Sequence, residues 1–507
     1  MMKKWFPALA AVLGIVIGAL AVATFDRYQQ QNRKLKADGD WRKLELVLQS
    51  ISENYVDSVD YETVSRAAID AALGELDPHS VYMPPVDLAQ SEEDLAGSFD
   101  GIGIQFNVPN DTAVIIEVIA GGPSEKIGLL SGDRIIKVDS VVIAGVNYPQ
   151  DSMVRRMKGP SGTKVTVTVS REGEMIPFEI TRGKIPTHSV DCAFMVDDTT
   201  AYLRLSKFAR TTYKEVVTAG YDLLEKGMTR MVLDIRDNSG GFFDQALLLA
   251  NLFLGKGDPI VYIEGLHRER EDFNADGNGL LQDVALTVLI NEGSASSSEI
   301  FAGAIQDNAR GQIIGRRSFG KGLVQEPVYF SDGSAVRLTV ARFYTPSGRC
   351  LQKPYSEDYA YEVYKRYDEG EMMEADSMKL ENGGIIPDVF VPVDTTRASN
   401  FYISCNRKAT AMRFASSFFD AHKADLGTIE DYQELLRYLD SSSLESRFLA
   451  FAKAKDGLVP DEGWPAERDY MMAQVRALVG RYSRLGDNAF YHLYLPVDNI
   501  WLKAIGQ

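Results

Sequence analysis

Residues 284–300 read VALTVLINEGSASSSEI, and this stretch decides the fold of the largest part of the chain. The apolar run Val284 to Ile290 has the length and composition of a buried strand, and a turn of small residues follows it. A helical pattern from Ser297 to Ala309 begins directly after that turn. A hydroxyl at this junction suits the stabilisation of an oxyanion, because helix-initial N–H groups point outward there. Serine is also a preferred N-cap residue, so helix capping is the competing interpretation.

The same alternation of strands and amphipathic helices continues on both sides of the stretch, across residues 185–394. Such alternation predicts a layered α/β core of sheet and helices. The expected strands are Ala201–Phe208, Met231–Ile235, Ile260–Ile263 and Ala335–Phe343, and the expected helices are Thr212–Lys226 and Asp244–Leu254.

Three further regions flank or interrupt this core. Residues 96–184 carry short strands and glycine-rich turns, which predicts a compact β-rich domain inserted before the core. Residues 41–95 have apolar positions at helical spacing and a breaker at Asp77-Pro78, so we expect a helical N-terminal region. Residues 395–507 predict a helical C-terminal extension, and its role is left open between dimerisation and binding of an adaptor protein.

The composition excludes nucleic acid as a partner. The 507 residues carry a formal net charge of −17, which would repel a phosphate backbone, and no basic stripe offsets it. The three cysteines, Cys192, Cys350 and Cys405, allow at most one disulfide and therefore no disulfide framework.

Residues 1–25 have the pattern of an export segment. Lys3 and Lys4 precede an uncharged apolar run from Trp5 to Phe25. A cleaved signal peptide and a signal anchor both fit, and we favour the anchor because the run is long enough to span a bilayer. The expectation is a protein exported across the bacterial cytoplasmic membrane into the periplasm and held at the inner membrane by this segment.

A nucleophilic serine needs a base, and none of the five histidines lies in a recognisable partner motif. A lysine can act instead when burial lowers its pKa. Lys321 lies between two glycines in Ser318-Phe-Gly-Lys-Gly322, where the backbone can turn closely against a site. The alternative is an ordinary surface lysine in a turn.

The region from Asn291 to Gln325 resembles the active site of the C-terminal processing peptidases, also called tail-specific proteases, which pair a serine with a lysine. The resemblance implies Ser296 as the nucleophile, Lys321 as the general base and Gln325 as the residue that orients the lysine. It also gives Asp307 a supporting role. Ser297 departs from the family pattern, in which alanine is common at this position.

Two other motifs agree with this resemblance. Residues 233–241, LDIRDNSGG, form a strand that ends in paired glycines. In the family such a turn supplies an oxyanion-hole amide, which implies Gly240 or Gly241 together with the amide of Ser297; a plain tight turn is the alternative. Residues 76–80, LDPHS, resemble a family motif in which we interpret His79 as structural.

Residues 101–106 read GIGIQF, and residues 121–129 read GGPSEKIGL. With these motifs the β-rich region resembles a PDZ domain, a module that captures a peptide C-terminus on backbone N–H groups and adds the peptide to a strand edge. Its predicted peptide-binding loop is Gly101, Ile102, Gly103 and Ile104. Together the motifs predict a serine endopeptidase that recognises protein C-termini through this domain and needs no cofactor or metal. The alternatives are a catalytically silent PDZ adaptor protein and an enzyme that acts on another acyl substrate.

One motif competes with these predictions. Residues 272–283 imitate a calcium-binding loop, with Asp283 at the twelfth place. Apolar strands rather than helices flank the motif, so we favour a polar hairpin.

Overall fold

The computed structural model describes residues 40–108, 111–119, 121–355, 361–374, 383–395 and 399–506. The chain separates into two compact units, Met1–Leu76 and Asp77–Gln507. The predicted export segment, residues 1–25, lies outside the described residues. Among the helices of the described ranges, none combines the length and the apolar character that a membrane crossing requires.

The first unit contains the helices α2 (Asp40–Asn54) and α3 (Tyr61–Gly74). The carboxylate of Asp60 caps α3 by accepting hydrogen bonds from the N–H groups of Glu62 and Thr63. These two helices confirm the helical N-terminal region.

The β-rich domain of the second unit is an antiparallel sheet in the order β3-β4-β5-β7-β8, with β6 paired to β5. Alternate residues of its strands, such as Ile115, Val167 and Val169, form a separate buried core. A two-stranded ribbon of β2 and β9 flanks the domain in sequence. The elements are β2 (Ser98–Gly101), β3 (Ile104–Asn107), β4 (Ala113–Val118), α5 (Pro123–Lys126), β5 (Arg134–Val138), β6 (Val141–Val142), α6 (Gln150–Met157), β7 (Lys164–Arg171), β8 (Glu174–Thr181) and β9 (Gly183–Pro186).

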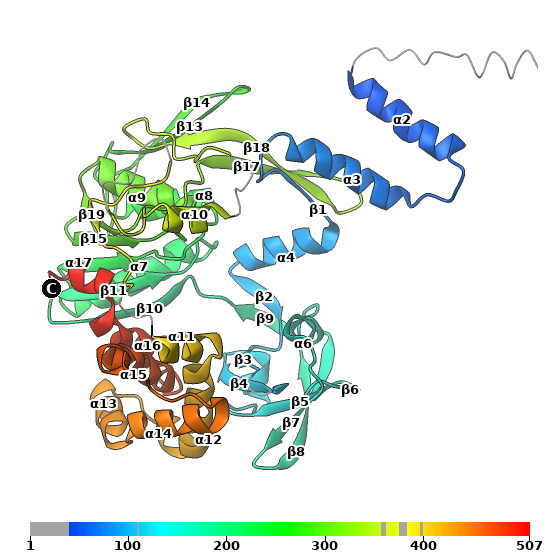
Figure 1. Ribbon diagram of the computed structural model, residues 1–507. Coiled ribbons are helices and arrows are strands. Elements are labelled where there is room, and N and C mark those ends of the chain that lie inside the picture. The colour runs from blue at the N-terminus through cyan, green and yellow to red at the C-terminus, as the bar shows by residue number, and fades with distance from the viewer. Residues whose placement is uncertain are drawn as a thin grey trace, which may run out of the picture. The chain divides into compact units, whose positions relative to one another are not determined.

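The α/β core is built on a six-stranded sheet in the order β10-β11-β12-β15-β16-β19, in which all pairs except β10 with β11 are parallel (Figure 1). Successive residues of β11 serve opposite faces: Leu203 packs under the helices, and Tyr202 packs on the other side. The elements are β10 (Val190–Met195), β11 (Thr200–Leu205), α7 (Thr212–Glu225), β12 (Arg230–Asp234), α8 (Phe243–Asn251), β15 (Ala285–Ile290), α9 (Ser297–Asp307), β16 (Gly311–Gly315) and β19 (Val389–Phe390).

A second sheet of this unit has the order β1-β18-β13-β14, with β17 paired to β18. Its first strand comes from the region before the β-rich domain, so the N-terminal part of the second unit is joined to the core by backbone pairing. The elements are β1 (Val81–Met83), α4 (Pro85–Leu95), β13 (Pro259–Gly265), β14 (Arg268–Asn274), β17 (Leu323–Tyr329), β18 (Ala335–Tyr344) and α10 (Glu362–Asp368).

The C-terminal region is helical and has its own core, which includes Phe414, Phe448 and Val475. Its last helix packs against the core sheet instead, with Ile500 and Trp501 on the second face of that sheet. Figure 1 shows this helix, in red, beside the strands of the core. The helices are α11 (Asn400–Arg407), α12 (Thr410–Leu426), α13 (Tyr432–Ser441), α14 (Leu444–Phe451), α15 (Trp464–Gly480), α16 (Asp487–Tyr494) and α17 (Asn499–Ala504), with short π and 3₁₀ turns at Ala452–Asp456 and Leu495–Val497.

The predicted fold class, an α/β core with a β-rich domain and helical terminal regions, is confirmed. All three cysteines are free. The stretch that imitates a calcium loop is not the polar hairpin that the sequence predicted, because the hairpin of β13 and β14 turns between Gly265 and Arg268, and residues 272–283 begin with the end of β14 and lead toward β15. The Asp276 carboxylate accepts from the side chain of Asn251.

Candidate active site

The turn between β15 and α9 places Ser296 in a strained backbone conformation. Its φ of 54° and ψ of −113° are unusual for a residue with a Cβ atom. Such a conformation costs about 1–3 kcal/mol and persists only where the surroundings hold it. A sharp turn from strand to helix presents a serine hydroxyl in the way that a nucleophile requires.

The hydroxyls of the neighbouring serines all donate hydrogen bonds to backbone carbonyls. Ser294 Oγ donates to Ile235 at 2.8 Å, Ser298 Oγ donates to Asn238 at 2.8 Å, and Ser297 Oγ donates to Gly241 at 3.0 Å. Within the described ranges, the Ser296 hydroxyl donates to no acceptor. The bonds therefore distinguish Ser296 from its neighbours on physical grounds.

Glu299, three residues after Ser296, joins the serine turn to the lysine loop. Its carboxylate is fully buried, and one oxygen, Oε2, accepts from the backbone N–H groups of Ser296 at 2.8 Å and Lys321 at 2.9 Å. The other oxygen accepts from Ser318 Oγ at 2.5 Å and from the N–H of Gly320 at 2.7 Å. Burial raises the pKa of this carboxyl, while the four hydrogen bonds oppose the rise.

The side chain of Lys321 is partly buried. Burial lowers the pKa of its amine, and the positive charge of Arg337 lowers it further. The carboxylates of Glu299 and Asp77 act in the opposite direction. The net direction favours the neutral amine, which is the form that accepts a proton.

Gln325 lies on β17 and lines the same cavity as Lys321. Its side-chain nitrogen donates to the carbonyl of His79 at 2.7 Å, and no hydrogen bond from its amide to Lys321 is present among the described residues. Burial, and next the charge of Lys321, lower the pKa of the His79 imidazole to about 4. His79 therefore belongs to the turn that supports Gln325, and its ring is neutral near pH 7.

The turn that carries Asp77 is itself fixed to the second sheet. The Asp77 carboxylate accepts from the N–H groups of His79 and Ser80 at 2.7 Å each, and Ser80 Oγ accepts from the N–H of Thr339 at 3.1 Å. Gln325 and this turn thus form one connected support beside the lysine.

The glycine turn after β12 packs directly against the serine. A Cβ atom on Gly240 would lie 2.9 Å from Ser296 Cβ, and Gly240 has a φ of 99° that favours glycine. The Gly240 N–H donates to Asn238 Oδ1 at 2.9 Å, so it is already engaged. The N–H groups of Gly241 and Ser297 have no acceptor among the described residues. Of the predicted pair of glycines, Gly241 is therefore the one with an available amide.

Both Ser296 and Lys321 line a cavity of about 920 Å³. Its walls come from the serine and glycine turns, from β17 and β18, and from helix α4, and they combine apolar with charged side chains. Besides the predicted site residues Ser296, Ser297, Lys321, Gln325, Gly240 and Gly241, the walls include Met83, Leu88, Arg210, Phe242, Ile300, Arg337 and Phe343.

The predicted peptide-binding loop begins at Gly101, the last residue of β2, and leads into the edge strand β3 at Ile104. The carbonyl of Ile102 accepts from the N–H and hydroxyl of Ser124, and Gly103 has a φ of 79°. Within the described ranges, the N–H groups of Ile102 and Gly103 donate to no acceptor. The loop thus has unused donors beside an open strand edge.

One residue of the site, Glu299, was missed from the sequence. The spacing of Ser296 and Glu299 fits a capping box, Ser-x-x-Glu, which is a usable sequence indication. Asp307 accepts from Arg349 Nη2 at 2.5 Å and from the N–H of Ser347 at 2.9 Å, so it fixes the loop after β18 and lies outside the walls of the cavity.

Comparisons with known proteins address the family to which the chain belongs. A family model described as peptidase family S41 matches residues 199–360, and a model described as PDZ domain matches residues 101–181. The “Probable CtpA-like serine protease” of Staphylococcus aureus strain COL is 33% identical over 360 residues, which cover 69% of this chain and 71% of the relative. The relative with the same description in Staphylococcus saprophyticus is 33% identical over 314 residues, which are 62% of this chain and 63% of the relative. Among solved structures, the photosystem II D1 C-terminal processing protease is 28% identical, with a TM-score of 0.39, over 70% of this chain and 87% of that one.

The fold and the cavity, together with the two family models and the curated relatives, define a serine protease core that carries a PDZ domain. The chain belongs to peptidase family S41.

Proposed function

We propose that this protein cleaves polypeptides by a Ser/Lys mechanism, with Ser296 as the nucleophile and Lys321 as the general base. One observation carries the proposal: a single buried oxygen, Glu299 Oε2, holds the backbone N–H groups of both residues within 3 Å. Both side chains face the same cavity, and the available hydroxyl and the lowered lysine pKa fit the two roles.

In the acylation step, the neutral amine of Lys321 takes the proton of Ser296 Oγ as this oxygen bonds to the substrate carbonyl carbon. The carbonyl oxygen becomes an oxyanion, and the N–H groups of Gly241 and Ser297 are the donors that remain available to stabilise it. When the C–N bond breaks, the lysine ammonium returns the proton to the leaving amine. The same amine then deprotonates a water molecule, whose oxygen bonds to the acyl carbon. The C–O bond to Ser296 breaks, and the lysine ammonium returns the proton to Ser296 Oγ.

Gln325 has a supporting role in this proposal. Its hydrogen bond to the His79 carbonyl fixes the side chain at the cavity wall near the lysine. Its amide oxygen is an acceptor that can orient the Lys321 amine.

The test compares Ser296→Ala and Lys321→Ala with a matched Ser441→Ala variant, whose side chain is exposed on the C-terminal region. We expect kcat/KM for an internally quenched peptide to fall about a thousandfold or more in the first two variants and to stay unchanged in the third. Cleavage by Ser296→Ala at the parent rate would disprove the nucleophile assignment.

We also propose that the PDZ domain selects substrates by their C-terminal carboxylate. The unused N–H groups of Ile102 and Gly103 can donate hydrogen bonds to that carboxylate, and the edge strand β3 can add the peptide backbone by β-augmentation. In the Ser296→Ala background, a peptide with a free C-terminus should bind at least about tenfold more tightly than its amidated form. Equal affinities would contradict C-terminal recognition.

We propose separately that the protein is exported and anchored in the inner membrane. The support for this proposal is the pattern of Lys3, Lys4 and the apolar run that follows. In a bacterial host, a tagged full-length chain should be found in the membrane fraction and be digested by protease added to spheroplasts. Recovery of the intact chain in the cytosolic fraction would contradict export.

A further inference from the structure

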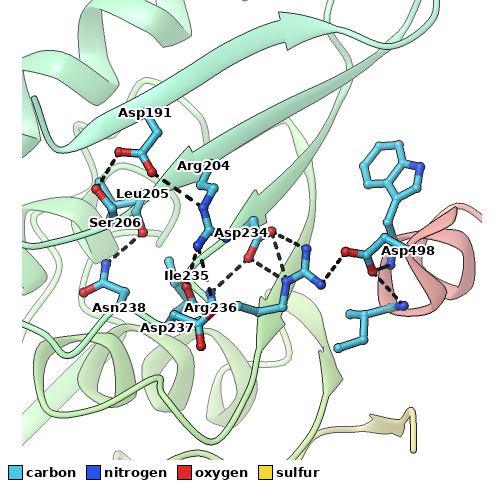
Figure 2. Close-up of polar contacts among 12 residues, drawn as sticks. Asp191, Arg204, Leu205, Ser206, Asp234, Ile235, Arg236, Asp237, Asn238 and Asp498 are labelled. Carbon is cyan, nitrogen blue, oxygen red and sulfur yellow. Dashed lines mark hydrogen bonds and ion pairs between the residues drawn. The ribbon is translucent and has the colours of Figure 1, made fainter. Parts of the chain in front are cut away.

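The C-terminal helix α17 is tied to the active-site scaffold by a buried ion pair. Asp498 precedes this helix, and its Oδ2 lies 2.7 Å from Nη1 of Arg236, which follows strand β12 (Figure 2). The other oxygen of Asp498 accepts from the N–H groups of Ile500 and Trp501 at 3.0 Å each. Both partners of the pair are at least 88% buried, with side-chain exposures of 12% and 8%.

Arg236 is held on its other side by Asp234. The guanidinium donates to both oxygens of the Asp234 carboxylate, at 2.6–3.0 Å. Tyr202 donates to the same carboxylate at 2.7 Å, and Arg204 Nη2 donates to the Arg236 carbonyl at 3.1 Å. Figure 2 shows the contacts of Arg204, Asp234, Arg236 and Asp498 as one chain of polar groups that runs from the sheet to the C-terminal helix.

The backbone that follows Arg236 leads directly into the glycine turn of the active site. Asp237 has a φ of 58°, and Gly240 and Gly241 have φ values of 99° and 146°. A non-glycine residue in this region is strained, so the turn depends on what fixes its ends. Asn238 fixes its middle, because Asn238 Nδ2 donates to the Leu205 carbonyl and Asn238 Oδ1 accepts from the N–H of Gly240. Arg236 fixes its beginning.

We propose that Asp498 is a positioning residue for catalysis: through Arg236 it holds the glycine turn whose Gly241 amide faces the oxyanion. The inference rests on the Ser296 mechanism proposed above. A cavity of about 300 Å³ lies beside the pair and is lined by both Arg236 and Asp498. It gives the arginine side chain room to change conformation when its second carboxylate is neutralised.

The key variant is Asp498→Asn, because asparagine keeps the N-cap of α17 while removing the charge that faces Arg236. The matched control is Asp431→Asn, which makes the same change at the N-cap of α13, where Asp431 accepts from the N–H of Glu434. We expect kcat for a quenched peptide to fall about tenfold in Asp498→Asn, with KM within about twofold, and to be unchanged in the control. Asp498→Glu keeps the charge and should recover part of the lost kcat.

A second measurement separates positioning from general loss of structure. A peptide boronic acid mimics the tetrahedral state and should bind Asp498→Asn about tenfold more weakly than the parent. A substrate peptide should bind Ser296→Ala with the same affinity whether or not Asp498→Asn is also present.

Three results would overturn the inference. Asp498→Asn could have a kcat within twofold of the control, or it could lose boronate and substrate affinity equally. The third result is that neither Asp498→Asn nor Asp498→Ser, whose serine can also cap α17, folds. None of these results contradicts the proposed Ser296 mechanism. That proposal fails separately, if Ser296→Ala remains active.

Discussion

Replacing Glu299 with glutamine tests the link between Ser296 and Lys321, the proposed nucleophile and base. The carboxylate accepts four hydrogen bonds, two on each oxygen, from Ser296, Lys321, Ser318 and Gly320. A glutamine side chain has one acceptor oxygen, and its NH₂ group would face two donors. Two buried donors therefore lose their acceptor in Glu299→Gln.

Each buried donor without a partner costs about 1–3 kcal/mol, so the free energy of unfolding should fall by about 2–6 kcal/mol. The backbone positions of Ser296 and Lys321 are then fixed less tightly, and displacements of about 1 Å cost roughly a hundredfold in rate. We expect kcat for a quenched peptide to fall by about that factor, and urea unfolding at neutral pH gives the stability change.

The matched control is Glu326→Gln. Glu326 is 48% exposed and forms an ion pair with Arg268 at 2.8 Å on the second sheet, so its loss should change stability by less than about 1 kcal/mol. If Glu299→Gln keeps kcat within threefold of this control, the carboxylate does not fix the two residues and the reasoning fails.

Three further substitutions test the surroundings of the site. Lys321→Met should abolish cleavage and raise the urea midpoint at neutral pH, because the lowered pKa of the lysine makes its burial unfavourable below that pKa. The difference in urea midpoint between variant and parent should shrink as the pH approaches the ordinary lysine value of 10.5. A difference that stays constant with pH would contradict the lowered pKa. His79→Gln should flatten the loss of stability between pH 6.5 and about 4, the range in which the unfolded chain binds a proton that the folded chain does not. The same change of unfolding midpoint with pH in variant and parent over this range would refute the prediction. Gly240→Ala should lower kcat about a hundredfold, because the new Cβ would lie 2.8 Å from the Ala295 carbonyl oxygen and 2.9 Å from Ser296 Cβ. A crystal structure of the variant in which Ser296 has not moved would contradict the steric argument.

Much of the core could be predicted from the sequence because its parallel strands are short apolar runs between amphipathic helices. Strand β15 and helix α9 follow this pattern closely. Strand β14 was missed, since its sequence REREDFN is charged and largely exposed at the edge of a sheet. Strand β17 was missed for a similar reason, because four of its seven residues are exposed.

The site was harder to predict, since several of its contacts join distant parts of the chain. The choice of Ser296 among four serines rested on family resemblance, whereas the hydrogen bonds of its neighbours give a physical reason. Nothing local to Gln325 indicates that its amide meets the carbonyl of His79, 246 positions earlier. The local sequence does not indicate the contact between Arg236 and Asp498 either, because 262 positions separate the two residues.

The strain at Ser296, the proposed nucleophile, explains why residues 284–300 bear on both the fold and the proposed chemistry. Ser296 and Asp237 both have positive φ, at 54° and 58°, and neither is glycine. Each is held by a side chain of the same segment: Glu299 accepts the N–H of Ser296 at 2.8 Å, and Asn291 Oδ1 accepts the N–H of Asp237 at 2.8 Å. Conformations that cost about 1–3 kcal/mol each thus persist because buried acceptors nearby offset them. The turn that follows β15 therefore supplies the hydroxyl and, at the same time, holds the strained backbone that presents it.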